Sequence, residues 1–403
     1  MQKEKLFTKS YIFACAANFL GCLGFFTLLP TLPILLIEKY GIIQSQVGII
    51  LASYAFAAML ARPFSAYFSD LYNRKTILCV FLAVYSLLFL PYAFLTGVAA
   101  FLVLRVVHGV FFGGETVCAN ALVTDIVCES RRGEGFGYFG VCNNVAMALG
   151  PMVGLYIHEF TGGFLWVSIT AFLFCAAGFL CILEVHLSPE QKRAKPAENR
   201  KMSLDKLFQP KGIYAGIALL FISYPWGFIF SFAAIYGKEL GIGGAMGAFF
   251  AFVSAGLVGS RLLSGKLVDK GKITAVIQFG SFAVAVVIAL FAAIGFIKLQ
   301  NGALLQILFY VIGLLIGVGY GIMFPAYNAL FVNLSPNDRR AAASSTYLTS
   351  WDVGLGLGLI FGAIIAQKYS YSYAFAVCAA SSFVSALFFT AFVSRHFNKY
   401  KLR

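Results

Sequence analysis

The composition of this 403-residue chain excludes a water-soluble globular protein, because 60% of its residues are hydrophobic and only 11% are charged. About a quarter of the residues of an ordinary globular domain are charged, and a soluble fold of this size could not cover so much apolar surface. The formal net charge of +14 does not indicate a nucleic-acid partner, because the basic residues fall in short runs between apolar stretches rather than on one solvated face; we interpret the chain as an integral membrane protein.

Twelve apolar stretches are long enough to cross a bilayer as helices, which takes about 20 residues each. They span 11–36, 46–69, 76–95, 98–124, 135–157, 163–186, 212–236, 244–267, 274–297, 302–331, 342–366 and 371–394. The alternating ten-residue segments of a membrane β-barrel do not occur. The predicted fold class is therefore an all-α membrane protein with 12 transmembrane helices. We expect the first helix to stay uncleaved, because its apolar run is longer than a signal-peptide core.

The placement of Lys and Arg predicts that both termini are cytoplasmic. With the N-terminus inside, 23 of the basic residues lie in cytoplasmic loops and termini. The opposite side holds only Lys39, Lys238, Lys298 and Lys368. We expect this basic surplus to set the topology and to contact anionic lipid.

An internal repeat divides the chain at the charged segment 187–211, which we expect to be a cytoplasmic linker between an N-terminal bundle (1–186) and a C-terminal bundle (212–403) of six helices each. Arg62 and Asp70 recur 199 residues later as Arg261 and Asp269. At an offset of 208, Gly109, Gly113, Asn120, Arg131, Arg132, Gly150 and Gly154 recur as Gly317, Gly321, Asn328, Arg339, Arg340, Gly358 and Gly362. Paired halves of this kind predict pseudo-symmetric bundles with a binding site between them and transport by alternating access.

The segment 62–75 resembles the Gly-x-Leu-Ala-Asp-Arg-x-Gly-Arg-Lys signature of the major facilitator superfamily, and the resemblance covers the whole chain. Asn73 stands at the second Gly of that signature, where we expect a positive φ that Asn tolerates. The second copy, 261–272, retains both glycines, Gly265 and Gly271. The resemblance implies the twelve-helix fold of the superfamily.

Charged residues of the two copies predict a cytoplasmic gate. They are Arg62, Asp70, Arg74, Lys75, Arg261 and Asp269. A carboxylate at a helix end beside Arg and Lys can form charge-assisted hydrogen bonds in one state of a transporter and lose them in the other. The alternative is a charge cluster that merely lies at the membrane interface.

Two further segments resemble motifs of the drug:proton antiporter branch of the superfamily. Arg105 and Gly109 in the fourth predicted helix resemble the Arg-x-x-x-Gly segment of proton-coupled members. Gly150, Pro151 and Gly154 in the fifth resemble a Gly-Pro motif, where we expect a helix kink. Because such a kink forms whatever the direction of transport, the second motif supports export only weakly.

Two acidic residues lie deep in apolar spans, Glu115 and Asp352, and with Arg105 they are the candidates for proton coupling. Asp352 lies about ten residues, or about 15 Å, into its helix. A carboxyl group in a low-dielectric environment can exchange a proton near neutral pH, as a coupling residue must. The alternative is a protonated acid that only hydrogen bonds to a neighbouring helix.

In the superfamily, helices one, four, seven and ten line a central cavity. The candidates for contact with a substrate are Asn18, Asn143, Asn144, Tyr224, Trp226, Tyr327, Asn328 and Trp351. Many aromatic rings with few fixed charges favour an amphipathic or aromatic organic compound over a sugar phosphate. The alternative for each aromatic side chain is that it only packs.

These features predict a secondary transporter that exports a small amphipathic or aromatic compound in exchange for protons. A proton-coupled uptake symporter and a lipid flippase of the same fold remain open. A membrane enzyme is not favoured, because the chain has no Gly-x-Ser-x-Gly or His-Glu-x-x-His motif. A transport-dead receptor is not favoured either, because the membrane acids and gate charges are present.

We expect no cofactor and no metal, with the proton gradient as the source of energy. The nine cysteines lie in or beside apolar helices without metal-ligand spacing, and no phosphate-binding loop for ATP occurs. One proton crossing 100 mV releases about 2.3 kcal/mol, which sustains roughly a fortyfold gradient. The expected partners are a small-molecule substrate and the lipid bilayer, and we expect a monomer in a bacterial inner membrane.

Overall fold

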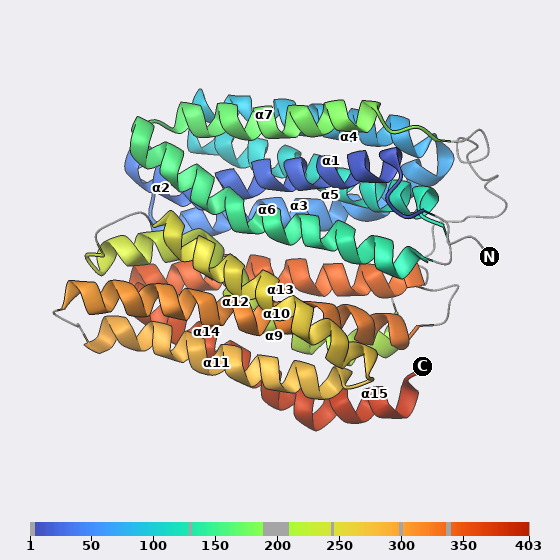
Figure 1. Ribbon diagram of the computed structural model, residues 1–403. Coiled ribbons are helices and arrows are strands. Elements are labelled where there is room, and N and C mark those ends of the chain that lie inside the picture. The colour runs from blue at the N-terminus through green and yellow to red at the C-terminus, as the bar shows by residue number, and fades with distance from the viewer. Residues whose placement is uncertain are drawn as a thin grey trace. The chain divides into compact units, whose positions relative to one another are not determined.

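The computed structural model describes residues 5–128, 131–187, 209–242, 246–297, 301–335 and 340–402. In these ranges the chain is almost entirely helical and forms no strand (Figure 1). Helices satisfy their own backbone hydrogen bonds, as a chain in hydrocarbon must. The predicted all-α membrane fold is therefore confirmed.

The first half of the chain forms α1 (Lys9–Leu28), α2 (Thr31–Tyr40), α3 (Gln44–Leu71), α4 (Arg74–Leu87), the 3₁₀ helix η1 (Leu90–Ala93), α5 (Val98–Ile126), α6 (Arg132–Thr161) and α7 (Phe164–Leu183). The second half forms the 3₁₀ helix η4 (Pro210–Gly212), α9 (Ile213–Glu239), α10 (Gly247–Asp269), α11 (Ile273–Ile297), α12 (Gly302–Asn333), α13 (Arg340–Lys368), α14 (Tyr371–Phe388), the π-helical segment η6 (Phe389–Val393) and α15 (Ser394–Tyr400). Among the described residues, 11 helices are long and apolar enough to cross a membrane. The remaining predicted span coincides with α10, whose apolar part is Gly247–Arg261.

Two predicted spans are interrupted where we expected continuous helices. The span 11–36 breaks after Leu28 and resumes as α2, with Pro30 in the break. The span 76–95 leaves α-helical geometry after Leu87 and ends in η1, which contains Pro91. Proline lacks an N–H and clashes with the preceding turn, so each interruption has a local cause.

The contacts within the chain define two compact units. Unit 1 comprises Met1–Thr31 and Phe56–Met202, and unit 2 comprises Leu32–Ala55 and Ser203–Arg403. Within unit 2, the backbone N–H of Ser45 donates to Gln367 Oε1 at 3.1 Å. The segment 32–55 thus packs with residues that follow it by about 320 positions. The predicted linker 187–211 lies largely outside the described residues.

Each unit contains a helix pair held together at an equivalent glycine. In unit 1, α6 packs on α1, and a Cβ on Gly150 would lie 2.8 Å from the carbonyl carbon of Phe26. In unit 2, α13 packs on α9, and a Cβ on Gly358 would lie 2.8 Å from the carbonyl carbon of Tyr224. Gly150 and Gly358 match at the 208 offset of the repeat, so close helix approach is the physical reason that both are glycine.

A second helix pair repeats in the same way. A Cβ on Gly113 of α5 would lie 2.9 Å from the Cα of Ala58 on α3, and one on Gly321 of α12 would lie 2.8 Å from the Cα of Leu257 on α10. The glycines are 208 residues apart and their partners 199. Both offsets of the sequence repeat therefore correspond to a repeated packing contact.

Candidate functional site

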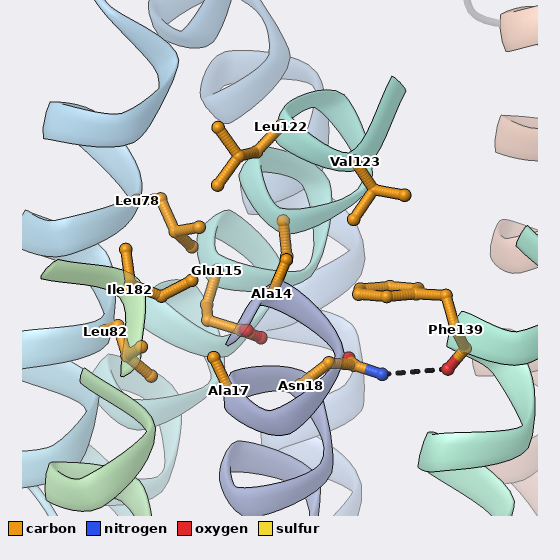
Figure 2. Close-up of a pocket in the computed structure, with 11 residues that line it drawn as sticks. Ala14, Ala17, Asn18, Leu78, Leu82, Glu115, Leu122, Val123, Phe139 and Ile182 are labelled. Carbon is orange, nitrogen blue, oxygen red and sulfur yellow. Dashed lines mark hydrogen bonds between the residues drawn. The ribbon is translucent and has the colours of Figure 1, made fainter. Parts of the chain in front are cut away.

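Glu115 lies on α5 inside unit 1 and is 5% exposed. Its carboxyl group faces α1, since Oε1 lies 4.0 Å from the position that a Cβ would take on Gly21. Figure 2 shows the side chain pointing into the bundle beside the small residues Ala14 and Ala17 of α1. No residue in the described part of the chain forms a hydrogen bond or an ion pair with this carboxyl group.

The Glu115 carboxyl group borders a small, mostly apolar cavity in unit 1. The residues around the cavity are Ala14, Ala17, Asn18, Leu78, Leu82, Glu115, Ala119, Leu122, Val123, Phe139 and Ile182. The cavity volume is about 10 Å³, which is near the minimum that holds one water molecule. The cavity is thus too small for an organic substrate.

Asn18 is the other polar residue of this cavity. Its Nδ2 donates a hydrogen bond to the backbone carbonyl of Phe139 at 3.1 Å (Figure 2). Its Oδ1 accepts from the thiol of Cys22 at 3.8 Å. These hydrogen bonds hold the Asn18 amide between α1 and α6, where it lines the cavity beside Glu115.

Arg105 is 1% exposed and lies on α5, ten residues or almost three turns before Glu115. Its guanidinium lies within electrostatic range of Tyr92. The hydroxyl of Tyr92 lies 3.1 Å from Nδ1 of His108, whose ring packs against Tyr85 and Phe89 at centroid distances of 4.7 and 4.5 Å. Arg105 therefore belongs to a buried polar cluster of its own within unit 1.

Two predicted gate residues form polar contacts at the end of the unit 1 helices. Arg74 Nη1 donates to Asp125 Oδ1 at 2.7 Å, which ties the start of α4 to the end of α5. Lys75 Nζ donates to the carbonyl oxygens of Leu183 and Val185, each at 2.8 Å, which ties the same point to the end of α7. Both basic residues thus join helices within one unit.

The turn before α4 corrects our expectation for Asn73. Its φ is −62°, in the extended region, and its side chain caps α4 by accepting from the N–H groups of Lys75 and Thr76. Gly271, the second glycine of the second copy, has a φ of +77°. The two copies therefore use different devices, a helix cap in unit 1 and a left-handed glycine in unit 2.

Of the other four predicted gate residues, the structure describes the side chains of the two arginines but not those of the two aspartates. Asp70 ends α3 and Asp269 ends α10, but their side chains lie outside the described residues. Arg62 is half-buried on α3, and Arg261 is half-buried on α10 within electrostatic range of Tyr347. The ion pairs expected of the two aspartates stay a prediction.

Unit 2 contains an aromatic cluster formed by Trp226 and Phe230 of α9, Tyr320 and Phe324 of α12, and Trp351 of α13. The ring of Trp226 is at the centre, at centroid distances of 4.4 Å from Phe230 and from Tyr320, 5.3 Å from Phe324 and 6.2 Å from Trp351. Trp226 is buried, whereas Phe324 and Trp351 are half-buried. The rings of Phe324 and Trp351 therefore stay partly accessible at the edge of a packed aromatic core.

Asp352 follows Trp351 on α13 and is 8% exposed. It lies within electrostatic range of Tyr347, one and a half turns earlier on the same helix. The ring of Trp351 lies 4.9 Å from that of Phe324. Unit 2 thus combines a buried acid with neighbouring aromatic rings.

The remaining substrate candidates divide by exposure. On α6, Asn143 is exposed, whereas Asn144 is buried and its amide nitrogen has no hydrogen-bond partner among the residues that the structure describes. Tyr224 and Tyr327 are buried on α9 and α12, and Asn328 is exposed. The helix α6 runs across Pro151 without a break between Arg132 and Thr161.

Sequence reasoning missed several residues of these sites, among them Asp125, Tyr92 and Phe324. Asp125, the partner of Arg74, is an acid at the end of a predicted span, so a search for acids across the loop from gate cations could have found it. Tyr92 and Phe324 carry no signal in a chain with 20 Tyr and 43 Phe. In the described ranges, no group of three or more His, Cys, Asp or Glu residues could hold a metal ion.

Comparisons with known proteins agree with this architecture. Residues 14–354 and 288–402 match the family model of the Major Facilitator Superfamily. The chain is 28% identical over 141 residues to the quinolone resistance protein NorA of Staphylococcus aureus, a match that covers 35% of this chain and only 36% of NorA. It is 22% identical over 344 residues to the staphylopine export protein of Staphylococcus aureus, which covers 84% of this chain and 85% of that protein.

The fold also resembles solved transporter structures. The crystal structure of a D-xylose-proton symporter matches with a TM-score of 0.77 at 13% sequence identity, covering 95% of this chain and 97% of that chain. Its likeness concerns the fold alone. Together with the family match over most of the sequence, the repeated helix packing and the membrane-spanning helices show that this chain belongs to the major facilitator superfamily of membrane transporters.

Proposed function

We propose that this protein exports a small amphipathic or aromatic organic compound in exchange for protons, by alternating access, and that Glu115 carries the exchanged proton. The observation that carries the proposal is the position of Glu115. Its carboxyl group is buried in unit 1 beside an apolar cavity of about one-water size, without a partner among the described residues.

An isolated carboxylate in such a place costs several kcal/mol relative to water. Glu115 is therefore expected to be neutral whenever the cavity is closed, and to ionise only when a conformational change brings water or a cation to it. Protonation and conformation are then linked, as coupled transport requires.

The same cavity favours a proton over a metal cation as the coupling ion. Metal cations such as Ca²⁺ take six or more oxygen ligands. Around this cavity the side chains offer only the Glu115 carboxyl group and the Asn18 amide, and the amide already hydrogen bonds to Phe139 and Cys22. A proton needs no such ligand set.

The substrate class rests on unit 2. An aromatic cluster with two half-buried rings beside the buried Asp352 can stack on an aromatic substrate and attract a positively charged group. We assign Asp352 to substrate recognition and Glu115 to the proton. The names of the relatives, a quinolone resistance protein and a staphylopine export protein, support export of an organic compound.

These bacterial relatives also support a plasma-membrane location. We further propose that the transporter is a monomer that needs no cofactor besides the proton gradient and has no nucleic-acid partner. The cytoplasmic orientation of both termini remains the prediction of the charge distribution.

The test is transport in proteoliposomes that contain the purified full-length protein and a panel of quinolones, aromatic cations and neutral aromatic compounds. Acidifying the outer solution should drive at least one compound out of the liposomes, and a protonophore should abolish that flux. Movement of the compound inward with the protons would show uptake symport instead. Flux that is indifferent to the pH gradient would overturn proton coupling.

A further inference from the structure

Unit 2 carries a group of basic and aromatic side chains where η4 and α15 meet. We call it the basic–aromatic cluster; it consists of Lys211, Tyr214, Arg395, His396, Lys399 and Tyr400. The Nε2–H of His396 donates to the carbonyl oxygen of Lys211 at 3.1 Å. The rings of Tyr214 and Tyr400 lie 4.9 and 4.7 Å from the ring of His396. The cluster therefore joins the start of one membrane-spanning segment, Pro210–Glu239, to the end of another, Tyr371–Tyr400.

The cations of the cluster gather around one ring. Lys211 Nζ and Lys399 Nζ lie 5.5 and 5.3 Å from the ring centroid of Tyr400. Arg395 and Lys399 are four residues apart and so share a face of α15. Lys211, Arg395, Lys399 and the adjacent Lys401 are exposed, and no described carboxylate pairs with any of them.

The helix that carries these cations is anchored to unit 2. The side chain of Phe397 is 3% exposed, so α15 is seated in the core. The backbone N–H of Leu402 donates to the carbonyl oxygen of Asn333 at the end of α12, at 3.0 Å. The positive charges are therefore held together before any ligand arrives, which lowers the entropy cost of binding.

Apolar side chains are exposed next to the same cations. Ile213 and Tyr214 follow Lys211, Leu402 follows Lys401, and Phe392 precedes Arg395 by one turn, and all four are exposed. Exposed apolar and tyrosine side chains lie beside cations that pair with no described carboxylate, at the ends of two membrane spans. This combination matches the boundary between hydrocarbon and charged headgroups.

We propose that the basic–aromatic cluster is a binding site for the phosphate headgroup of an anionic phospholipid. Lys211 and Lys399 attract the phosphate from two elements, Arg395 offers a bidentate contact, and the tyrosines lie at headgroup depth. This inference does not depend on the proposed transport reaction, because it concerns the lipid that surrounds the protein and not the exported compound.

The test is native mass spectrometry of the detergent-purified full-length protein with phosphatidylglycerol and with phosphatidylcholine of the same acyl chains. We expect wild type to retain phosphatidylglycerol preferentially. Since a basic residue near an anionic lipid contributes about fivefold in affinity, the double variant Lys211→Gln/Lys399→Gln should lose roughly tenfold or more. Its affinity for phosphatidylcholine should not change.

The matched control is Lys39→Gln/Lys368→Gln. These lysines are also exposed, and each lies 5.4 Å from the ring of a neighbouring tyrosine, Tyr40 or Tyr369. This variant removes the same charge and should keep the lipid preference. Equal loss in both double variants, or unchanged retention in Lys211→Gln/Lys399→Gln, would overturn the proposal.

A second arm separates a lipid headgroup from a soluble anion. Inorganic phosphate and phosphatidylglycerol are each titrated against the melting temperature of the detergent-solubilised protein. We expect stabilisation by the lipid at concentrations where inorganic phosphate has no effect, and loss of that stabilisation in Lys211→Gln/Lys399→Gln. Equal stabilisation by inorganic phosphate would assign the cluster to a soluble anion and overturn the lipid proposal.

Discussion

Two buried acids, one in each unit, differ in their surroundings, and this difference separates their expected roles. Glu115 borders a small apolar cavity whose other polar residue, Asn18, is already hydrogen bonded. Asp352 adjoins Trp351, whose ring packs against Phe324. A group that only exchanges a proton needs the first kind of environment, and a group that contacts an aromatic substrate needs the second.

Glu115→Gln should lower the rate of transport driven by a pH gradient by roughly tenfold or more, because an amide cannot release a proton. Exchange of labelled for unlabelled substrate at equal pH should continue near the wild-type rate. The control is Glu184→Gln, which removes an exposed carboxylate 3.8 Å from Lys9 in the same unit. Driven transport that survives in Glu115→Gln would remove this residue from the mechanism.

Asp352→Asn should instead weaken substrate binding. We expect KM to rise by about tenfold for positively charged aromatic compounds and by less than about twofold for neutral ones, since the substitution removes a charge and keeps the shape. Initial rates over a range of substrate concentrations, measured with both classes, check this. A loss of pH-driven transport at saturating substrate, with KM unchanged, would assign the proton to Asp352.

At the scale of helices, small residues determine how closely the helices approach. Gly150 on α6 and Gly358 on α13 occupy equivalent contacts, because a Cβ on either residue would lie 2.8 Å from a carbonyl carbon of the facing helix. Neither helix can accept a side chain at this point without moving away from its partner. The repeat in the sequence is therefore a repeat of helix contacts.

Gly150→Ala and Gly358→Ala should each destabilise the protein by about 1–3 kcal/mol through overpacking. Gly137→Ala, on the same helix as Gly150 but exposed and with nothing within 4 Å of its Cβ position, should have no such effect. Melting temperatures of the three purified variants in one detergent check this. A Gly150→Ala protein as stable as Gly137→Ala would show that α1 and α6 are not in close contact.

The connection between α4 and α5 gives a second test at this scale. Arg74→Gln removes the ion pair with Asp125. Because this contact positions helices and not substrate, the turnover rate should fall roughly fivefold, whereas KM should change by less than about twofold. Rates in proteoliposomes check the prediction. A change confined to KM would show that Arg74 acts on binding.

At the scale of the whole molecule, hydropathy and charge predicted the class and most spans correctly, because a chain in lipid must satisfy every backbone group within a helix. The interruptions at Pro30 and Pro91 were missed, since proline is tolerated in many membrane helices and its effect depends on neighbours. At Pro151, by contrast, α6 continues from Arg132 to Thr161, and the kink expected there stays a prediction.

The candidate sites were predicted less completely than the fold. The sequence marked Glu115 as unusual, but not that it faces α1 inside a bundle, because α5 is apolar on nearly all sides and its pattern does not show which face meets which neighbour. The aromatic cluster around Trp226 joins α9 to α12 and α13, which follow it by about 60 residues or more, so no local spacing could reveal it.

The central claim is that a proton on Glu115 is exchanged for each substrate exported. The most direct measurement is the pH inside proteoliposomes, followed with a trapped pH-sensitive dye, while a transported compound is released down its own gradient. The account predicts that release of the compound acidifies the lumen in wild type and in Glu184→Gln, and leaves the pH unchanged in Glu115→Gln. Acidification by Glu115→Gln at the wild-type rate would contradict it.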